Sequence, residues 1–214
     1  HNVLIGSSWT VRDMAGVFRY NLVLQAGEDW MWLDTGAYVH HNLFIGGDNN
    51  RSGLYNTYGN TGIRIENNTF DGQGGTGQGV DAIYVTGDET VSSNLFMNLP
   101  YSPVDLVSGV LNADYNLFWN TATPFYSDAR TPAHDRHADP LLAGPAAYAY
   151  EFDERAVWQR TQSVHGILSD YRLKYAPKAG SPVIGNGDTG ISGGAGNFIG
   201  AIGDGTHVPD GFGQ

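Results

Sequence analysis

The stretch IRIENNTFDG, residues 63–72, joins an alternating strand to a turn and then to an aromatic residue. Ile63 and Ile65 alternate with Arg64 and Glu66, which is typical of a strand with one buried face. Two asparagines follow, and Phe70 comes two residues after the second of them. The same shape recurs in four other segments, VFRYNLV (17–23), YVHHNLF (38–44), TVSSNLF (90–96) and NADYNLF (112–118).

The asparagines of this motif recur at intervals of 21, 26, 26 and 22 residues, at Asn21, Asn42, Asn68, Asn94 and Asn116. Such a period fits a leucine-rich repeat or a parallel β-solenoid. The intervening segments lack regularly spaced leucines and contain short β-branched and aromatic runs punctuated by Gly, Asn and Asp, which favours the solenoid. The asparagines should then stack in one buried column and bond one another. Asn67 is expected in a left-handed turn.

The Asn-x-Phe columns of residues 1–127, with SPVIGNGD and NFIGAIG near the C-terminus, resemble the right-handed parallel β-helix superfamily. That superfamily includes pectate lyases and many secreted proteins that act on polysaccharides. We therefore expect an all-β fold, a right-handed parallel β-helix with an irregular, partly helical C-terminal segment. Its expected parts are β-helix coils over 1–127, an insertion or tail packed on the solenoid over 128–170 with a short helix in FDERAVWQR, and a closing β-helix segment with a C-terminal tail over 171–214.

The composition limits the partners. The net charge is −11, and residues 1–127 contain four arginines, no lysine and twelve carboxylates, so nucleic acid is excluded as a partner. No apolar run is long enough to span a membrane, and there is no cysteine. An acidic, cysteine-free, lysine-poor chain suits an extracellular or cell-surface location. Self-association through the solenoid is a further expectation.

Alternation along the strands predicts two outward columns, Arg19–His40–Glu66–Ser92–Asp114 and Val17–Tyr38–Arg64–Thr90–Asn112. The resemblance implies that an active site lies on such a face, and its catalytic candidates are Arg19, His40, Arg64 and Glu66. An arginine could bind a sugar carboxylate, His40 could transfer a proton near neutral pH, and Glu66 could act as acid, base or metal ligand. Alternatively, these are solvated residues of an exposed face. The polygalacturonase signatures and a lyase-type lysine base are absent from residues 1–127.

Aromatic and acidic residues supply two further candidate sites. Trp30 and Trp32 are two residues apart and should face one side of a strand, so with Tyr38, Tyr55 and Tyr58 they are candidates for stacking on sugar rings; packing under loops is the alternative. The segment GGTGQGVDAIYV (74–85) resembles the glycine-rich calcium nonapeptide, which makes calcium the candidate cofactor. The alternative is a flexible Gly-rich loop that joins two strands and binds no metal. The candidate calcium ligands are Asp71, Asp81 and Asp88.

A column of leucines should also point outward, because it alternates with the buried asparagines. It comprises Leu22, Leu43, Leu95 and Leu117, with Thr69 in the remaining coil. A soluble protein covers such an apolar strip, either with its own C-terminal region or with another chain, and we expect the former. The apolar residues available between 140 and 175 include Leu141, Leu142, Tyr148, Tyr150, Phe152, Val157, Trp158, Ile167 and Leu168.

These observations support two functions. The first is a secreted or cell-surface β-helix protein that binds or processes a polysaccharide, as a lyase or hydrolase would. The alternative is a non-catalytic structural, adhesive or filament-forming surface solenoid. Since fold analogy alone does not establish function, the geometry of the outward faces has to decide between them.

Overall fold

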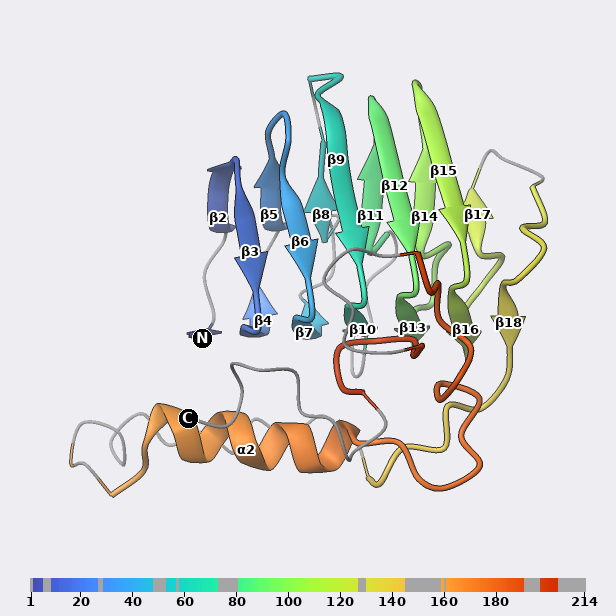
Figure 1. The fold of residues 1–214 in the computed structure, drawn as a ribbon. Helices are drawn as coiled ribbons and strands as arrows, with labels where there is room; N and C mark the ends of the chain where they lie inside the picture. Colours follow the sequence, from blue (N-terminus) through green and yellow to red (C-terminus); the bar gives the residue numbers. More distant parts are fainter. Residues whose placement is uncertain are drawn as a thin grey trace.

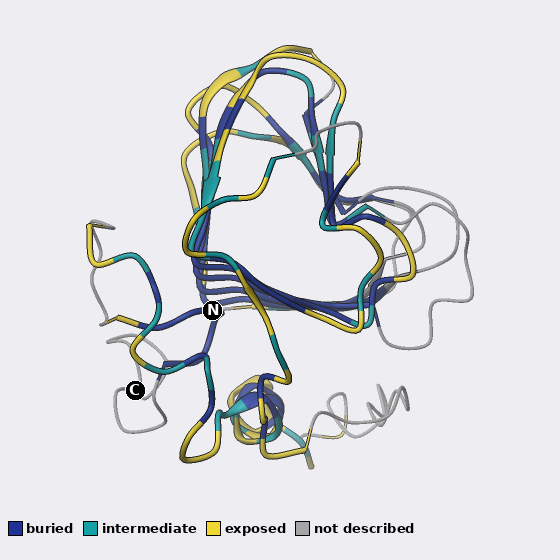
Figure 2. Ribbon diagram, turned by 90° about the vertical axis from the view of Figure 1, so that its right-hand side faces the viewer, coloured by how far each residue is buried: buried dark blue, intermediate teal, exposed yellow. Residues whose placement is uncertain are grey.

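The computed structural model describes residues 2–5, 9–26, 29–47, 53–56, 58–72, 81–126, 130–144, 159, 161–190 and 197–203. Its strands pair in parallel with the strands of neighbouring coils, which gives three sheets (Figure 1). The predicted parallel β-solenoid is therefore confirmed, and its right-handed winding stays a prediction. Viewed along the axis, the coils superpose into a closed outline (Figure 2).

Five successive coils each supply one strand to every sheet; a first strand precedes them in sheet A, and the last turn adds one strand to sheet B and one to sheet A. Sheet A has seven strands in the order β1 (Val3–Ile5), β4 (Leu22–Ala26), β7 (Leu43–Gly47), β10 (Thr69–Asp71), β13 (Leu95–Met97), β16 (Leu117–Trp119) and β18 (Arg136–His137). Sheet B has six, β2 (Trp9–Met14), β5 (Asp29–Leu33), β8 (Leu54–Tyr55), β11 (Ile83–Val85), β14 (Val104–Leu106) and β17 (Phe125–Tyr126). Sheet C has five, β3 (Val17–Arg19), β6 (Tyr38–His40), β9 (Thr61–Glu66), β12 (Asp88–Ser92) and β15 (Val110–Asp114).

The asparagine column lies at the turn between sheets C and A and is confirmed. Oδ1 of Asn68 accepts hydrogen bonds from the backbone N and the Nδ2 of Asn42, each at 3.0 Å, and Asn68 makes the same pair of bonds to Asn94 at 2.9 and 3.1 Å. Nδ2 of Asn68 also donates to the carbonyls of Val39 and Glu66. The expected left-handed turn is confirmed as well, because φ of Asn67 is +51°.

Phenylalanine rings stack inside the coils, two residues after the asparagines. The centroids of Phe44, Phe70, Phe96 and Phe118 are 5.0, 5.0 and 5.1 Å apart along the column, and the rings are nearly parallel. Each ring is therefore covered by the rings above and below it, which excludes water from the centre of the solenoid.

The last coil replaces each column residue with a polar one. Asp135 accepts the ladder bond from the backbone N of Asn116 at 2.8 Å, Arg136 pairs with Leu117, and His137 stacks on Phe118 at 5.5 Å. The sequence Asp-Arg-His thus stands where earlier coils have Asn-Leu-Phe. A terminal repeat needs a polar outer surface, so this coil closes the solenoid.

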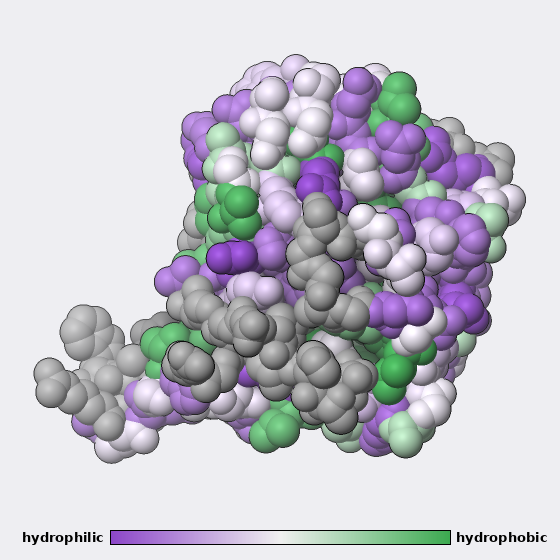
Figure 3. Space-filling view, in the orientation of Figure 1, coloured by the Kyte–Doolittle hydropathy of each residue, from purple (hydrophilic) through white to green (hydrophobic). Residues whose placement is uncertain are grey.

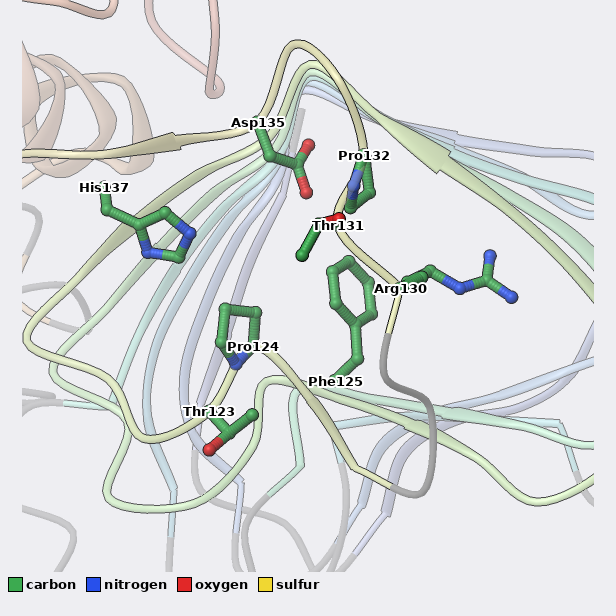
Figure 4. A pocket seen from close by; sticks show the side chains of 8 residues that line it. All are labelled: Thr123, Pro124, Phe125, Arg130, Thr131, Pro132, Asp135 and His137. Carbon is green, nitrogen blue, oxygen red and sulfur yellow. The ribbon is translucent and has the colours of Figure 1, made fainter.

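A cavity of about 400 Å³ lies under this closing coil. Pro124 and Phe125 lie on one side of it and Pro132 on the other, while the guanidinium of Arg130 points away from it (Figure 4). Asp135 also lines it, so the closing coil covers the end of the core without filling it.

The leucine column is buried, as expected, against the chain's own C-terminal region. Helix α2 (Val164–Tyr175) runs beneath sheet A and appears end-on in Figure 2. The side chains that pack on the column are Leu142, Ile167, Leu168, Tyr171, Tyr175, Val183, Ile199, Ala201 and Ile202. Thr69, which replaces a leucine, accepts a hydrogen bond from the backbone N of Ala201 at 3.0 Å. Among the residues that the structure describes, no helix is long and apolar enough to cross a membrane.

Other expectations about the C-terminal region are either untested or not met. Tyr148, Tyr150, Phe152, Val157 and Trp158 lie outside the described residues, as does the helix expected at 152–160 apart from Gln159. Leu141 is exposed and does not join the cover. The described part of 171–214 contains the end of α2, turns and isolated antiparallel bridges, and it adds no strand to the three sheets. The three-part division of the chain stays a prediction.

Leu168→Ala is expected to destabilise the protein by about 2 to 4 kcal/mol, because it leaves a cavity between α2 and the leucine column. Leu173→Ala is the matched control, since Leu173 lies in the same helix but is 70% exposed. We expect the control to change stability by less than about 0.5 kcal/mol. Urea unfolding measured by circular dichroism checks both values. Equal midpoints for the two variants would contradict the packing of α2 on the leucine column.

Candidate functional site

The outward columns of sheet C have the predicted register but not the expected exposure. Strand pairing aligns Arg19, His40, Glu66, Ser92 and Asp114, and it aligns Val17, Tyr38, Arg64, Thr90 and Asn112. The side of the molecule seen in Figure 3 is mostly hydrophilic, with scattered hydrophobic residues. His40, Glu66 and Ser92 are nevertheless buried. The picture of a fully solvated strip is therefore wrong.

Arg64, Glu66 and Tyr38 form one cluster with His40. Nε and Nη2 of Arg64 donate to the two carboxylate oxygens of Glu66 at 3.0 and 2.8 Å. The ring of Tyr38 lies between the guanidinium of Arg64, 4.3 Å away, and the ring of His40, also 4.3 Å away. Burial raises the pKa of Tyr38, and the negative charge of Glu66 raises it further. The arginine and the glutamate thus neutralise each other.

His40 is held in the neutral form. Burial, together with the nearby charges of Arg19 and Arg64, lowers its pKa to about 4. The adjacent His41 is also buried, which lowers its pKa to about 3, and the Nδ1 atoms of the two rings are only 2.7 Å apart. One Nδ1 must donate and the other accept, so the Nδ1 atom of each histidine is engaged in the hydrogen bond to the other. The expectation that His40 titrates near neutral pH is therefore wrong.

The predicted catalytic residues are brought together, but His40 and Glu66 are buried. Arg19 is exposed, and its guanidinium lies 5.5 Å from the ring of Tyr20, which itself contacts both histidines. The ring of Phe198, from the C-terminal region, lies 5.8 Å from the ring of His41. Acid–base chemistry would require movement of these covering groups, because a general base must reach its proton directly or through one water.

The prediction that Trp30 is available for stacking on sugar rings is wrong. Its ring lies in the core, 5.2 Å from Phe44, and its Nε1 donates to the carbonyl of Gly46 at 3.2 Å. Strand β5 begins at the corner where the chain leaves sheet A, so Trp30 points inward although Trp32 points outward. A side chain at Gly53 would strike the ring of Trp30, which accounts for glycine at that position.

The other aromatic residues form an outward column on sheet B. Pairing aligns Trp32, Tyr55, Tyr84, Asp105 and Tyr126 in successive coils. The centroids of Trp32 and Tyr55 are 6.2 Å apart, and those of Tyr55 and Tyr84 are 4.4 Å apart. We call these residues the sheet B column.

Two further side chains extend this column at its N-terminal end. The guanidinium of Arg12 lies 4.4 Å from the Trp32 ring centroid. Tyr58 meets Trp32 edge-on at 6.3 Å and is 73% exposed. Because the column rings stack on one another, a ligand would meet their edges and hydroxyl groups, together with the open face of Tyr58.

Carboxyl groups accompany the sheet B column. Oδ2 of Asp29 accepts a hydrogen bond from Nε1 of Trp32 at 2.6 Å. Burial raises the pKa of Asp81 to about 7, and the charge of Asp105 contributes to this shift. Burial also raises the pKa of Asp105, whose Oδ1 is buried with no hydrogen-bond partner. The face therefore combines aromatic rings with strong acceptors of hydrogen bonds.

The structure does not bring the three predicted calcium ligands together. Asp71 lies on sheet A and accepts hydrogen bonds from Tyr175 at 2.6 Å and Asn98 at 2.9 Å, whereas Asp88 lies on sheet C and Asp81 precedes β11 of sheet B. Most of the glycine-rich segment lies outside the described residues. Within the described ranges, no group of three or more acidic, histidine or cysteine side chains could hold a metal ion.

Arg12, Tyr84, Asp105 and Tyr126 were missed by the sequence reasoning. Their signal is a second repeat, an apolar residue followed by an aromatic one, in Met31-Trp32, Leu54-Tyr55, Ile83-Tyr84 and Phe125-Tyr126. The variable loops shift this repeat against the asparagines. No protein-family model matches the chain, and no curated protein matches it. The function therefore has to be inferred from the geometry of its faces.

Proposed function

We propose that this chain is part of a secreted or cell-surface β-helix protein, similar to the pectate-lyase-like superfamily, that binds a neutral polysaccharide along the sheet B column. The observation that carries the proposal is the run of Trp32, Tyr55 and Tyr84 on outward positions of three successive coils. An extended polymer can follow such a regular column. Aromatic rings offer apolar contact area together with hydrogen-bonding groups, which suits the two kinds of surface on a sugar.

The charges favour a neutral polymer over an acidic one. The chain has a net charge of −11, and Asp81 and Asp105 lie at or beside the column. Asp29, by contrast, is buried and hydrogen-bonded to Trp32. Carboxylates accept hydrogen bonds from sugar hydroxyls but repel uronic acids. Of the arginines expected to attract uronates, Arg64 is already paired with Glu66, and Arg19 lies on sheet C, away from the column.

Binding is proposed without catalysis by the sheet C cluster. His40 and Glu66 are buried and engaged by their neighbours, so the cluster stabilises the fold as it stands. This supports a surface protein that attaches to a glycan. A surface solenoid with an adhesive role is compatible with the same binding face.

Trp32→Ala and Tyr84→Ala are each expected to weaken polysaccharide binding by about tenfold, because truncating an aromatic residue of a binding face removes apolar contact area at a cost above about 1 kcal/mol. Affinity electrophoresis in gels containing hydroxyethyl cellulose, galactomannan or xylan measures the effect, with polygalacturonate as the acidic comparison. Trp119→Ala is the matched control, since Trp119 is 39% exposed on sheet A, away from the column. Unretarded migration of the unmodified protein in all three neutral gels would refute the proposal.

A further inference from the structure

A polar pocket of about 350 Å³ lies where the last full coil meets the returning C-terminal chain. One wall consists of Tyr115 and residues 133–136, and the other consists of residues 185–187, Thr189 and Asn197. Its volume is within the range of small-molecule sites. It shares no residue with the sheet B column and belongs to the end of the sheet C column that contains Asp114.

His134 is held in a fixed orientation in this pocket. Its Nδ1 lies 2.7 Å from Oδ2 of Asp114, and its backbone N donates to Oδ1 of the same carboxylate at 2.9 Å. The ring of Tyr115 stacks on the imidazole at 4.2 Å and is parallel to it within 6°. Burial alone would raise the pKa of Asp114, but the hydrogen bonds from His134 and Tyr115 hold it below its ordinary value.

This orientation leaves one nitrogen of His134 for a ligand. The ionised carboxylate of Asp114 can only accept, so Nδ1 carries the proton and Nε2 presents its lone pair when the ring is neutral. The side chain of His134 remains accessible to a ligand, because it lines the pocket and is 53% exposed. An aspartate that fixes the tautomer of a histidine is a means of orienting its second nitrogen.

The rest of the lining favours a neutral, hydroxyl-rich ligand. Asp135 and Arg136 contribute one charge of each sign, so neither a cation nor an anion is preferred. Asn186, whose Oδ1 accepts from Arg136, Thr189 and Asn197 add amide and hydroxyl groups. The apolar parts are limited to Ala133 and the stacked rings of Tyr115 and His134, which is too little for a large apolar ligand.

We propose that this pocket binds a neutral saccharide of one or two residues, with Nε2 of His134 accepting a hydrogen bond from a sugar hydroxyl. Arg136 and the amide of Asn197 donate to ring or hydroxyl oxygens. The amide of Asn186, in contrast, already donates to the carbonyls of Pro182 and Ile184. The inference rests on the pocket alone, and it stands whether or not the sheet B column binds a polysaccharide.

Isothermal titration calorimetry tests it with glucose, galactose, mannose, xylose, cellobiose and maltose. We expect saturable binding of at least one of them. His134→Ala should weaken that binding by about tenfold through loss of the hydrogen bond. Thr189→Trp, at an exposed pocket position, should abolish it by filling the space. Trp119→Ala, on sheet A and outside both the pocket and the sheet B column, should leave it unchanged.

Absence of saturable binding for all six sugars overturns the inference, and so does wild-type affinity in Thr189→Trp. If His134→Ala fails to fold, the exposed Thr189→Trp variant decides the question alone. Affinity electrophoresis separates the two proposals, because His134→Ala should keep the full retardation by neutral polysaccharides, which Trp32→Ala should reduce.

Discussion

Replacing Asn68 with leucine is expected to lower the free energy of unfolding by at least about 3 kcal/mol. The leucine supplies neither the acceptor for the backbone N of Asn42 nor the donor for the carbonyls of Val39 and Glu66. These groups are deep in the solenoid, where water cannot replace the lost partner, and each unsatisfied group costs about 1 to 3 kcal/mol. Urea unfolding followed by circular dichroism measures the change.

Asn2→Leu is the matched control for this experiment. Asn2 continues the same ladder, donating from its backbone N and its Nδ2 to Oδ1 of Asn21, but it is exposed at the end of the row. Water can take over its bonds, so the substitution should cost less than about 1 kcal/mol. Equal losses in the two variants would show that burial of the ladder is not what makes it stabilising.

Glu89→Gln is expected to stabilise the protein at pH 8 by about 4 kcal/mol and to change little at pH 4. Glu89 points into the solenoid from β12, aligned with Ile63 and Leu111, and accepts a hydrogen bond from Nδ2 of Asn56 at 2.8 Å. Burial raises its pKa to about 8, although the bond from Asn56 opposes the shift. The glutamine has nearly the same shape and cannot ionise.

The sign follows from the protons held in each state. Between about pH 4.5 and 8 the unfolded chain has released the proton of Glu89 while the folded protein still holds it. Stability contributed by this group is therefore complete below the unfolded pKa and is lost as the pH rises through the folded one. Asp81 and Asp135, with pKa values raised to about 7 and 6, add to the slope of the unmodified protein, so the difference between the two proteins isolates Glu89. Unfolding free energies at pH 4, 6 and 8 that differ by a constant would refute this assignment.

The sequence was most informative where neighbouring residues repeat at a constant offset. The spacing of Asn68 and Phe70 recurs in three other coils, and Val23 replaces the phenylalanine in the first, so their columns and the leucine column between them could be predicted directly. The prediction for Trp30 was wrong, because side chains alternate along a strand but need not do so at its first residues, and Trp30 is the second residue of β5. Its inward position depends on Phe44 and Gly53 of other strands.

Contacts between distant parts of the chain account for the remaining errors at the candidate sites. Burial near His41 involves Phe198, whose carbonyl accepts a hydrogen bond from Asn67, 131 residues earlier in the chain. The pairing of His134 with Asp114 likewise arises only after the chain has turned through another coil. No local pattern encodes such meetings. Residue types alone could suggest acid–base chemistry at His40, but only packing shows that its proton affinity is too low.

The polar closing coil has an evolutionary consequence. Each interior coil presents the same groups to the next coil: an asparagine amide, a phenyl ring and, in all but one coil, a leucine. The Asp-Arg-His coil pairs with only the single coil beneath it. Duplication or loss of an entire coil in the interior would therefore leave every column in register and the closing end intact. The proposed binding face on sheet B would lengthen or shorten in increments of one strand, without the need for a new fold.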